Sequence, residues 1–357
     1  MKAGFRGTFV IAWSQTELDG QRSGPLRDLA AGGNWRWTGE AVRVDGPAGV
    51  LPLGVAKGEA DIRRRAAQSV RRLLRAVDAD ASALDQPEPV DPLFSQNFTV
   101  TDGLRIWVVT LVGMGAGRKP LLMFAGDIPP RATDLWIVRV DASASLLREP
   151  DAAPGGVICF TPGTMILTPD GPRDVASLLE GDLVQTQDNG AAEILWLGQK
   201  QLSGARLRAV PDLAPVRLRA GALDRDVPDA GLLVSPDHRV VLRGPKARTL
   251  FNHDEVLVAA RDLVNDRTIM RDHSRRQVTY IHMMLPRHEI VFANGVATES
   301  FHPASAALAS LQPDEQDRLL RRMPDLRGDP QAYGGFARPM LGASDAAILQ
   351  HGQGRIR

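Results

Sequence analysis

The chain has 357 residues, more than one hydrophobic core usually accommodates, so we expect two domains. An apolar share of 43%, a charged share of 24% and a net charge of +1 are ordinary for a globular protein, and they point to neither nucleic acid nor a membrane surface as a partner. The single cysteine, Cys159, excludes an intramolecular disulfide and a four-thiolate zinc site. The sequence indicates no cofactor and no metal.

Targeting signals are also missing from the sequence. No run reaches the roughly 20 apolar residues of a membrane span. The apolar core near the N-terminus, "FVIAW", is shorter than the roughly seven residues that a signal peptide needs. We therefore expect a soluble protein, cytoplasmic by default, while export by a route that cleaves no signal stays open.

Residues 1–147 predict an α+β domain of unknown role. The expected strands combine β-branched and aromatic residues between turn signals, and they lie within 7–13, 35–44, 49–55, 97–112, 120–130 and 134–143. Asp102–Gly103 predicts a hairpin turn inside 97–112. A helix is expected over 58–77, because Ile62, Ala66 and Val70 recur at helical spacing on one face. Residues 148–158, rich in Pro, Gly and Ala, predict a linker.

From Cys159 onward the pattern changes to short strands separated by Gly, Pro, Asp and Asn. Such regular turns predict an all-β domain over residues 159–303, so the chain as a whole is expected to be mainly β. The expected strands lie within 164–175, 182–198, 214–223, 232–242, 256–264, 278–285 and 288–298. The C-terminal tail, 304–357, contains one predicted helix at 313–323.

The segment that begins at Cys159 resembles the opening block of the Hint family, the fold shared by hedgehog autoprocessing domains and inteins. That block has a leading Cys, then a "TxI" strand, a Gly, and an "LxxGDxV" segment. Here these are Cys159, Thr164-Met165-Ile166, Gly171 and, within the last segment, "LEGDLV" at 179–184. The family's fold, a horseshoe-like arrangement of intertwined β-hairpins, is what the resemblance implies for this half of the chain.

Two later segments match further blocks of the family in the correct order. "SPDH" resembles the block with Thr-x-x-His, with Ser235 in place of Thr and His238 as the histidine. The closing block, a hairpin around Asn-Gly, is matched by His288, Asn294 and Gly295. The resemblance covers about Cys159 to Pro303, and "CFTPGT" and "ESF" are most similar to the bacterial proteins with a single processing module.

Such a domain implies self-cleavage by its cysteine. A thiolate adjacent to a peptide carbonyl can attack it, so Cys159 would convert the Ile158–Cys159 amide into a thioester. The departing nitrogen must gain a proton, and a histidine can supply one near neutral pH. The resemblance assigns this role to His238. Ser235 would bond the same amide or polarise its carbonyl.

Three further residues have less defined roles. His288 could assist the second step or hold the closing hairpin. Asp237 would point to the opposite strand face from His238, which leaves its role open. Ser300 occupies the position where hedgehog domains have a second Cys, so thiol exchange is not available there. Core packing is expected for Trp35 and Trp37, and neither His282 nor His302 has a partner that the sequence identifies.

The sequence departs from its family in ways that bear on activity. Inteins end in His-Asn, but this chain reads Thr298-Glu299-Ser300-Phe301, so full splicing is not expected. Hedgehog-type sites usually have Gly before the nucleophile, whereas β-branched Ile158 crowds the carbonyl and favours slow or triggered cleavage.

The main hypothesis is a self-processing protein that divides after Ile158, with its own N-terminal segment as substrate and with water or an unidentified external nucleophile resolving the thioester. Two alternatives remain open. One is a catalytically inert Hint-fold module that acts in structure or binding. The other is a cysteine hydrolase that acts on external substrates.

Overall fold

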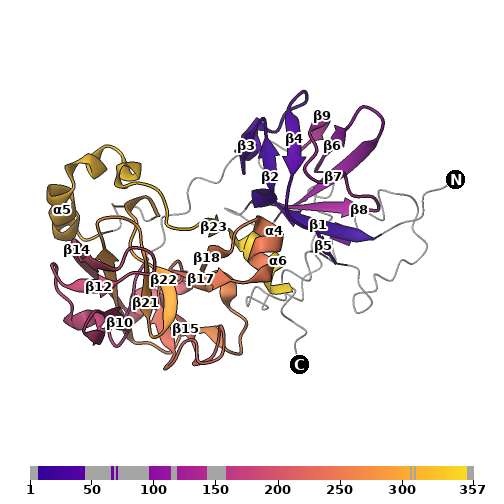
Figure 1. The fold of residues 1–357 in the computed structure, drawn as a ribbon. Helices are drawn as coiled ribbons and strands as arrows, with labels where there is room; N and C mark the ends of the chain where they lie inside the picture. The colour runs from indigo at the N-terminus through magenta and orange to yellow at the C-terminus, as the bar shows by residue number, and fades with distance from the viewer. Residues whose placement is uncertain are drawn as a thin grey trace. The chain divides into compact units, whose positions relative to one another are not determined.

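The computed structural model describes residues 7–44, 66, 67, 70, 96–113, 119–142, 158–305, 308 and 311–351. The chain forms two compact units: unit 1 is Met1–Ala152, Arg243–Asp254 and Leu341–Arg357, and unit 2 is Ala153–Leu242 and Glu255–Met340. The chain therefore leaves unit 2 at residue 243 and returns at residue 255. Antiparallel strands dominate both units (Figure 1), which confirms the expected mainly β class.

A nine-stranded sheet with the order β3-β2-β4-β9-β6-β7-β8-β1-β5 forms the body of unit 1. Its strands are β1 (Thr8–Ala12), β2 (Thr16–Leu18), β3 (Gln21–Arg22), β4 (Asn34–Trp37), β5 (Val42–Arg43), β6 (Asn97–Thr101), β7 (Ile106–Val112), β8 (Leu121–Ala125) and β9 (Leu135–Asp141). Trp35 and Trp37 are buried in the core of this unit, as expected, and the Trp35 ring packs edge-on against Phe98 with centroids 5.6 Å apart. The predicted turn at Asp102 joins β6 to β7, and its carboxylate accepts the N–H groups of the two residues that follow Gly103.

Part of the N-terminal prediction can be compared with the structure. Ala66, Ala67 and Val70 are helical and buried, in agreement with the predicted apolar stripe. The predicted strand at 49–55, the remainder of the helix and the linker up to residue 157 lie outside the described residues.

Unit 2 contains several smaller sheets. The largest has seven strands in the order β11-β10-β21-β22-β17-β18-β23; β12 pairs with β13, β14 with β20, and β16-β15-β19 form a three-stranded sheet. The strands are β10 (Met165–Thr168), β11 (Gly171–Asp174), β12 (Leu183–Gln185), β13 (Ala191–Glu193), β14 (Trp196–Ser203), β15 (Val216–Leu218), β16 (Leu232–Val234), β17 (Arg239–Arg243), β18 (Glu255–Ala259), β19 (Ile269–Arg271), β20 (Gln277–Met284), β21 (Ile290–Ala293), β22 (Val296–Glu299) and β23 (Met340–Leu341). The sequence did not predict β19 or β23.

Short helices connect these strands. They are α3 (Gly204–Ala209), α4 (Pro245–Phe251), α5 (Pro313–Arg322) and α6 (Ala343–His351). α5 lies where the sequence predicts it, whereas α3, α4 and α6 were not predicted. In the part of the chain that the structure describes, no helix is long and apolar enough to cross a membrane.

Candidate active site

The segment around Cys159 lies between two strands of unit 2. Phe160 forms antiparallel bridges with Val234, at the end of β16, and with Ile281 in β20. In antiparallel pairing the residue before Phe160 faces the residue after each partner, so Cys159 lies opposite Ser235 on one side and His282 on the other. The register therefore fixes which two side chains flank the cysteine.

Both ends of the Ile158–Cys159 peptide bond are held by these neighbours. The N–H of Cys159 donates to Ser235 Oγ at 2.9 Å, and the Ser235 N–H donates to the Cys159 carbonyl at 3.0 Å. The Ile158 carbonyl accepts a hydrogen bond from His282 Nδ1 at 3.0 Å. The same imidazole contacts the cysteine, with Sγ 3.3 Å from Nδ1 and 3.5 Å from Nε2.

These contacts define the protonation state of His282. A carbonyl can only accept, so Nδ1 carries the hydrogen and Nε2 presents a lone pair within reach of the thiol. Burial lowers the pKa of His282 to about 4, with the Ile158 carbonyl opposing the shift. At neutral pH the ring is thus a neutral imidazole with a donor on the carbonyl and an acceptor beside the sulfur.

The thiol itself is fully enclosed. Cys159 is 0% exposed and Ile158 is 2% exposed. Burial raises the pKa of Cys159 well above its usual range; Lys200 opposes this shift and Glu315 adds to it. The cysteine is therefore a protonated thiol in the closed structure, and any nucleophilic attack needs a base to remove its proton in the same step.

Aromatic side chains fix the imidazole of His282. Its ring packs against Phe301 with centroids 4.9 Å apart and against Trp196 at 5.9 Å. Trp196 folds over Gly198, where an added Cβ would lie 2.2 Å from the indole, so only glycine leaves room for this arrangement. The local sequence Trp-x-Gly thus forms one wall of the site.

The side chain of His238 lies beside Thr298 and Phe160. Its Nε2 lies 2.5 Å from Thr298 Oγ1, which itself donates to the Arg239 carbonyl, so His238 Nε2 carries the hydrogen. Its ring packs edge-on against Phe160 at 4.5 Å, and its Nδ1 has no hydrogen-bond partner in the described part of the chain. Burial lowers the pKa of His238 to about 4. His238 is therefore a neutral imidazole at neutral pH, and it packs against Phe160, the residue that follows the cysteine.

His288 contacts the Glu299 carboxylate, and Asp237 forms an ion pair with Arg261. His288 Nε2 is 3.2 Å from Glu299 Oε2, and both side chains are fully buried. Burial works against ionisation of Glu299, but Arg239 and His288 outweigh it and hold the pKa of this carboxyl below its usual value. Asp237 pairs with Arg261, yet burial raises the pKa of its carboxyl. His288 thus connects to the end of β22, which agrees with a role in holding the closing hairpin.

The closing hairpin depends on Asn294 and Gly295. Both have positive φ, 47° and 75°, as a tight two-residue turn between β21 and β22 requires. The Asn294 side chain also accepts the Met165 N–H at 2.7 Å, which ties this turn to β10. Ser300 is buried, and its hydroxyl accepts the Glu289 N–H at 3.0 Å. These three residues position the closing hairpin.

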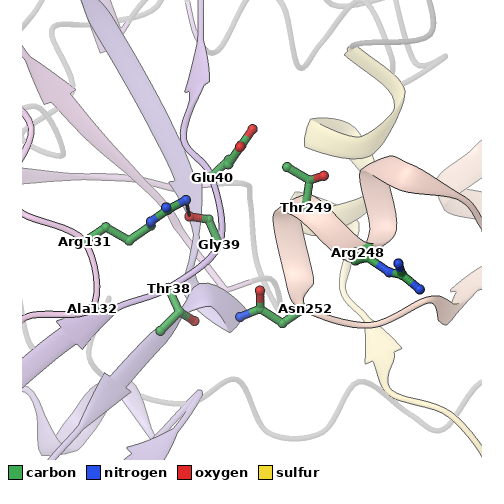
Figure 2. Close-up of a pocket in the computed structure, with 8 residues that line it drawn as sticks. All are labelled: Thr38, Gly39, Glu40, Arg131, Ala132, Arg248, Thr249 and Asn252. Atoms are coloured by element: carbon green, nitrogen blue, oxygen red, sulfur yellow. Dashed lines mark hydrogen bonds between the residues drawn. The ribbon is translucent and has the colours of Figure 1, made fainter.

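Unit 1 also contains a hollow. An open pocket of about 440 Å³ lies between the turn at Thr38–Glu40 and α4 (Figure 2), lined by Thr38, Gly39, Glu40, Arg131, Ala132, Arg248, Thr249 and Asn252. Charges of both signs face it and its lining holds no histidine or cysteine. Among the described residues, no cluster of His, Cys, Asp or Glu has an arrangement that could hold a metal ion.

Sequence reasoning thus identified Cys159 and Ser235 as neighbours but missed His282 as the imidazole beside the sulfur. It also found no partner for His302, which donates from Nε2 to the Gly334 carbonyl at 2.9 Å. Only the strand register could have paired His282 with Cys159, because 122 residues separate them in the chain.

One comparison with known proteins gives a match within unit 2. Residues 158–305 match the family model for the Hint domain, whose members are known for autoprocessing. A search of curated proteins found no match. The match begins at the residue before the cysteine and ends just after the closing hairpin. Unit 2 of this chain therefore contains a Hint domain, at residues 158–305.

Proposed function

We propose that this protein cleaves its own backbone after Ile158, with Cys159 as the nucleophile. One observation carries the proposal: both the N–H and the C=O of the Ile158–Cys159 peptide bond are hydrogen-bonded to side chains, and the thiol touches the imidazole that holds the carbonyl. An ordinary packed cysteine needs none of these contacts.

The first step is an N-to-S acyl shift. As Sγ bonds to the Ile158 carbonyl carbon, His282 Nε2 takes the thiol proton and Nδ1–H donates to the oxygen that becomes negative. The resulting imidazolium strengthens the hydrogen bond to the oxyanion. Collapse of the tetrahedral intermediate then breaks the C–N bond and leaves a thioester between Ile158 and Cys159.

The departing nitrogen becomes the α-amine of Cys159 and needs one proton. Because burial keeps both His238 and His282 neutral near pH 7, the proton that it gains is the one that left the thiol. The imidazolium of His282 holds that proton and returns it to the nitrogen, while Ser235 Oγ accepts the hydrogen that the nitrogen already carries and keeps it oriented. His238, which the family resemblance assigns to this step, has an unpartnered Nδ1 and remains the second candidate for the transfer.

Water, a thiol or another external nucleophile then resolves the thioester and releases a fragment of 158 residues. A measurement of intact mass tests the proposal. The full chain is incubated with and without dithiothreitol or hydroxylamine, beside Cys159→Ala. Two fragments that appear in the native chain and not in the variant support self-cleavage; an intact chain of 38.7 kDa under every condition contradicts it.

The complete burial of Cys159 favours a second candidate, a Hint fold that is inert and serves as a structural or binding module. Under that alternative the chain stays intact even when the thiol is made accessible. Burial also argues against a hydrolase for external substrates, because such an enzyme needs a thiol that opens onto a cleft. Cleavage of an added peptide without self-division would favour the hydrolase.

A further inference from the structure

The Hint match ends at residue 305, but unit 2 continues to Met340. Residues 311–338, here called the strap, include α5 and extend over the same unit. Apolar side chains of the strap belong to one buried cluster with Ile158, Trp196, Met284 and Phe301; they are Leu311, Leu319, Leu320, Leu326 and Tyr333. The apolar side chains of the strap therefore pack in the same cluster as Ile158, the residue whose carbonyl belongs to the scissile bond.

Polar contacts attach the strap to the strands that flank the site. Arg318 donates to the Leu197 carbonyl in β14 and, at 3.1 Å, to Glu180. The Gln199 N–H, also in β14, donates to Glu315 in α5. Farther along, the Tyr333 hydroxyl donates to the Leu285 carbonyl at 2.8 Å, just beyond the end of β20. These bonds connect the strap to both strands of the β14–β20 pair.

Two histidines of the Hint domain hold the end of the strap. His302 donates to the Gly334 carbonyl at 2.9 Å, and His288 Nδ1 accepts the Ala337 N–H at 3.0 Å. The His302 ring also stacks on Phe336 at 4.0 Å. These contacts give His288 and His302 a structural task apart from the scissile bond, and they explain why both are buried.

Solvent nucleophiles reach a thioester at Ile158 only when the strap opens transiently, because the Ile158 side chain is buried among apolar residues of the strap. The neighbouring sulfur is buried as well, among Leu202, Leu207, Val278 and Tyr280. While the strap is closed, the thioester returns to the amide, because the α-amine of Cys159 stays beside it and water is excluded. Glu315, on α5, further disfavours the thiolate, so the strap also opposes activation of Cys159.

From this arrangement, which rests on the function proposed above, we infer that the strap is an autoinhibitory cover: it shields the Ile158–Cys159 junction, and its displacement is required before an external nucleophile can release the N-terminal fragment. Opening admits water or another nucleophile to the Ile158 carbonyl carbon. The nucleophile bonds to that carbon, the C–S bond breaks, and the thiol regains a proton.

Thiol labelling tests the cover directly, because Cys159 is the single cysteine of the chain. The full chain and the double variant Arg318→Ala/Tyr333→Phe are treated with N-ethylmaleimide under native conditions, and adduct formation is followed by intact mass. Each lost hydrogen bond shifts an opening equilibrium by about three- to tenfold, so we expect labelling at least about tenfold faster in the double variant. Arg321→Ala, an exposed arginine of the same helix, is the matched control and should label at the native rate.

The same samples receive hydroxylamine, so that cover and cleavage are measured separately. Labelling and fragment formation that both rise in the double variant support the cover and the cleavage. Faster labelling with no fragments in any sample leaves the cover supported and overturns the proposed cleavage. Unchanged labelling in the double variant overturns the cover, whether or not fragments form. If circular dichroism shows that the double variant is unfolded, Tyr333→Phe alone is compared with Arg321→Ala by the same criteria.

Discussion

Replacing His282 with Phe removes both ring nitrogens while keeping the aromatic contacts with Phe301 and Trp196. The Ile158 carbonyl loses the donor that it now has at 3.0 Å, and Sγ loses the base at 3.5 Å. Loss of one oxyanion donor usually costs about 10²–10³ in rate, so we expect hydroxylamine-dependent cleavage to slow by at least about 100-fold. The unpaired buried carbonyl should lower the free energy of unfolding by about 1–3 kcal/mol.

The assay compares the rate of fragment formation in His282→Phe, His282→Asn and His273→Phe, with urea unfolding measured for each. An asparagine amide can reach the position of Nδ1 and donate to the Ile158 carbonyl, but it is not a base. Partial rescue by His282→Asn would assign much of the effect to the donor, and no rescue would assign it to the base. His273 is exposed, so its variant controls for the substitution itself. Cleavage by His282→Phe at the native rate would refute the role given to this imidazole.

Three further predictions concern the same site. Ser235→Ala leaves the buried N–H of the Ile158–Cys159 bond without an acceptor, so the free energy of unfolding measured in urea should fall by about 1–3 kcal/mol, and cleavage should slow. A variant that keeps the native stability and the native cleavage rate would contradict this prediction. Gly198→Ala forces the Trp196 indole to move and should cost about 1–3 kcal/mol while changing tryptophan fluorescence, and an unchanged spectrum would show that the contact is tolerated. Burial lowers the pKa of His238 and of His282 to about 4, below the roughly 6.5 of an unfolded histidine, so the unfolded chain binds more protons between these values. The stability that these residues contribute is present above about pH 6.5 and is lost as the pH falls towards 4, at up to about 1.4 kcal/mol per pH unit for each residue. A free energy of unfolding that stays constant in urea titrations from pH 7.5 to 4.5 would contradict this prediction.

Local pattern was enough to predict most strands of unit 2. Alternating β-branched residues and turn signals gave β10, β16 and β21 within the expected segments, and Asn294–Gly295 gave the closing turn. These features depend on neighbouring residues alone, as does the three-block order that indicated the Hint domain. The short helices were missed because six to nine residues carry little periodicity. α3, for example, is defined mainly by the Ser203 hydroxyl that caps it.

The arrangement of the candidate site was harder to predict because it depends on strand register. A motif can state that His238 follows Ser235 by three residues, but the tight turn in which His238 N–H donates to the Ser235 carbonyl directs the two side chains to different neighbours. His282 lies opposite Cys159 only because Phe160 pairs with Ile281, and a shift of one residue would turn His282 to the other face. The contacts of the strap could not be predicted from the sequence either, because they join residues that lie far apart in the chain.

The most direct test of the account is the chemical identity of the end that hydroxylamine creates. After treatment of the strap-weakened full chain, mass spectrometry of the N-terminal fragment should give residues 1–158 ending in a hydroxamate on Ile158, and the matching fragment should begin with Cys159. That pair of ends arises only from an acyl group transferred to the sulfur. Absence of this pair of ends, or its formation in Cys159→Ala as well, would contradict self-cleavage at this bond.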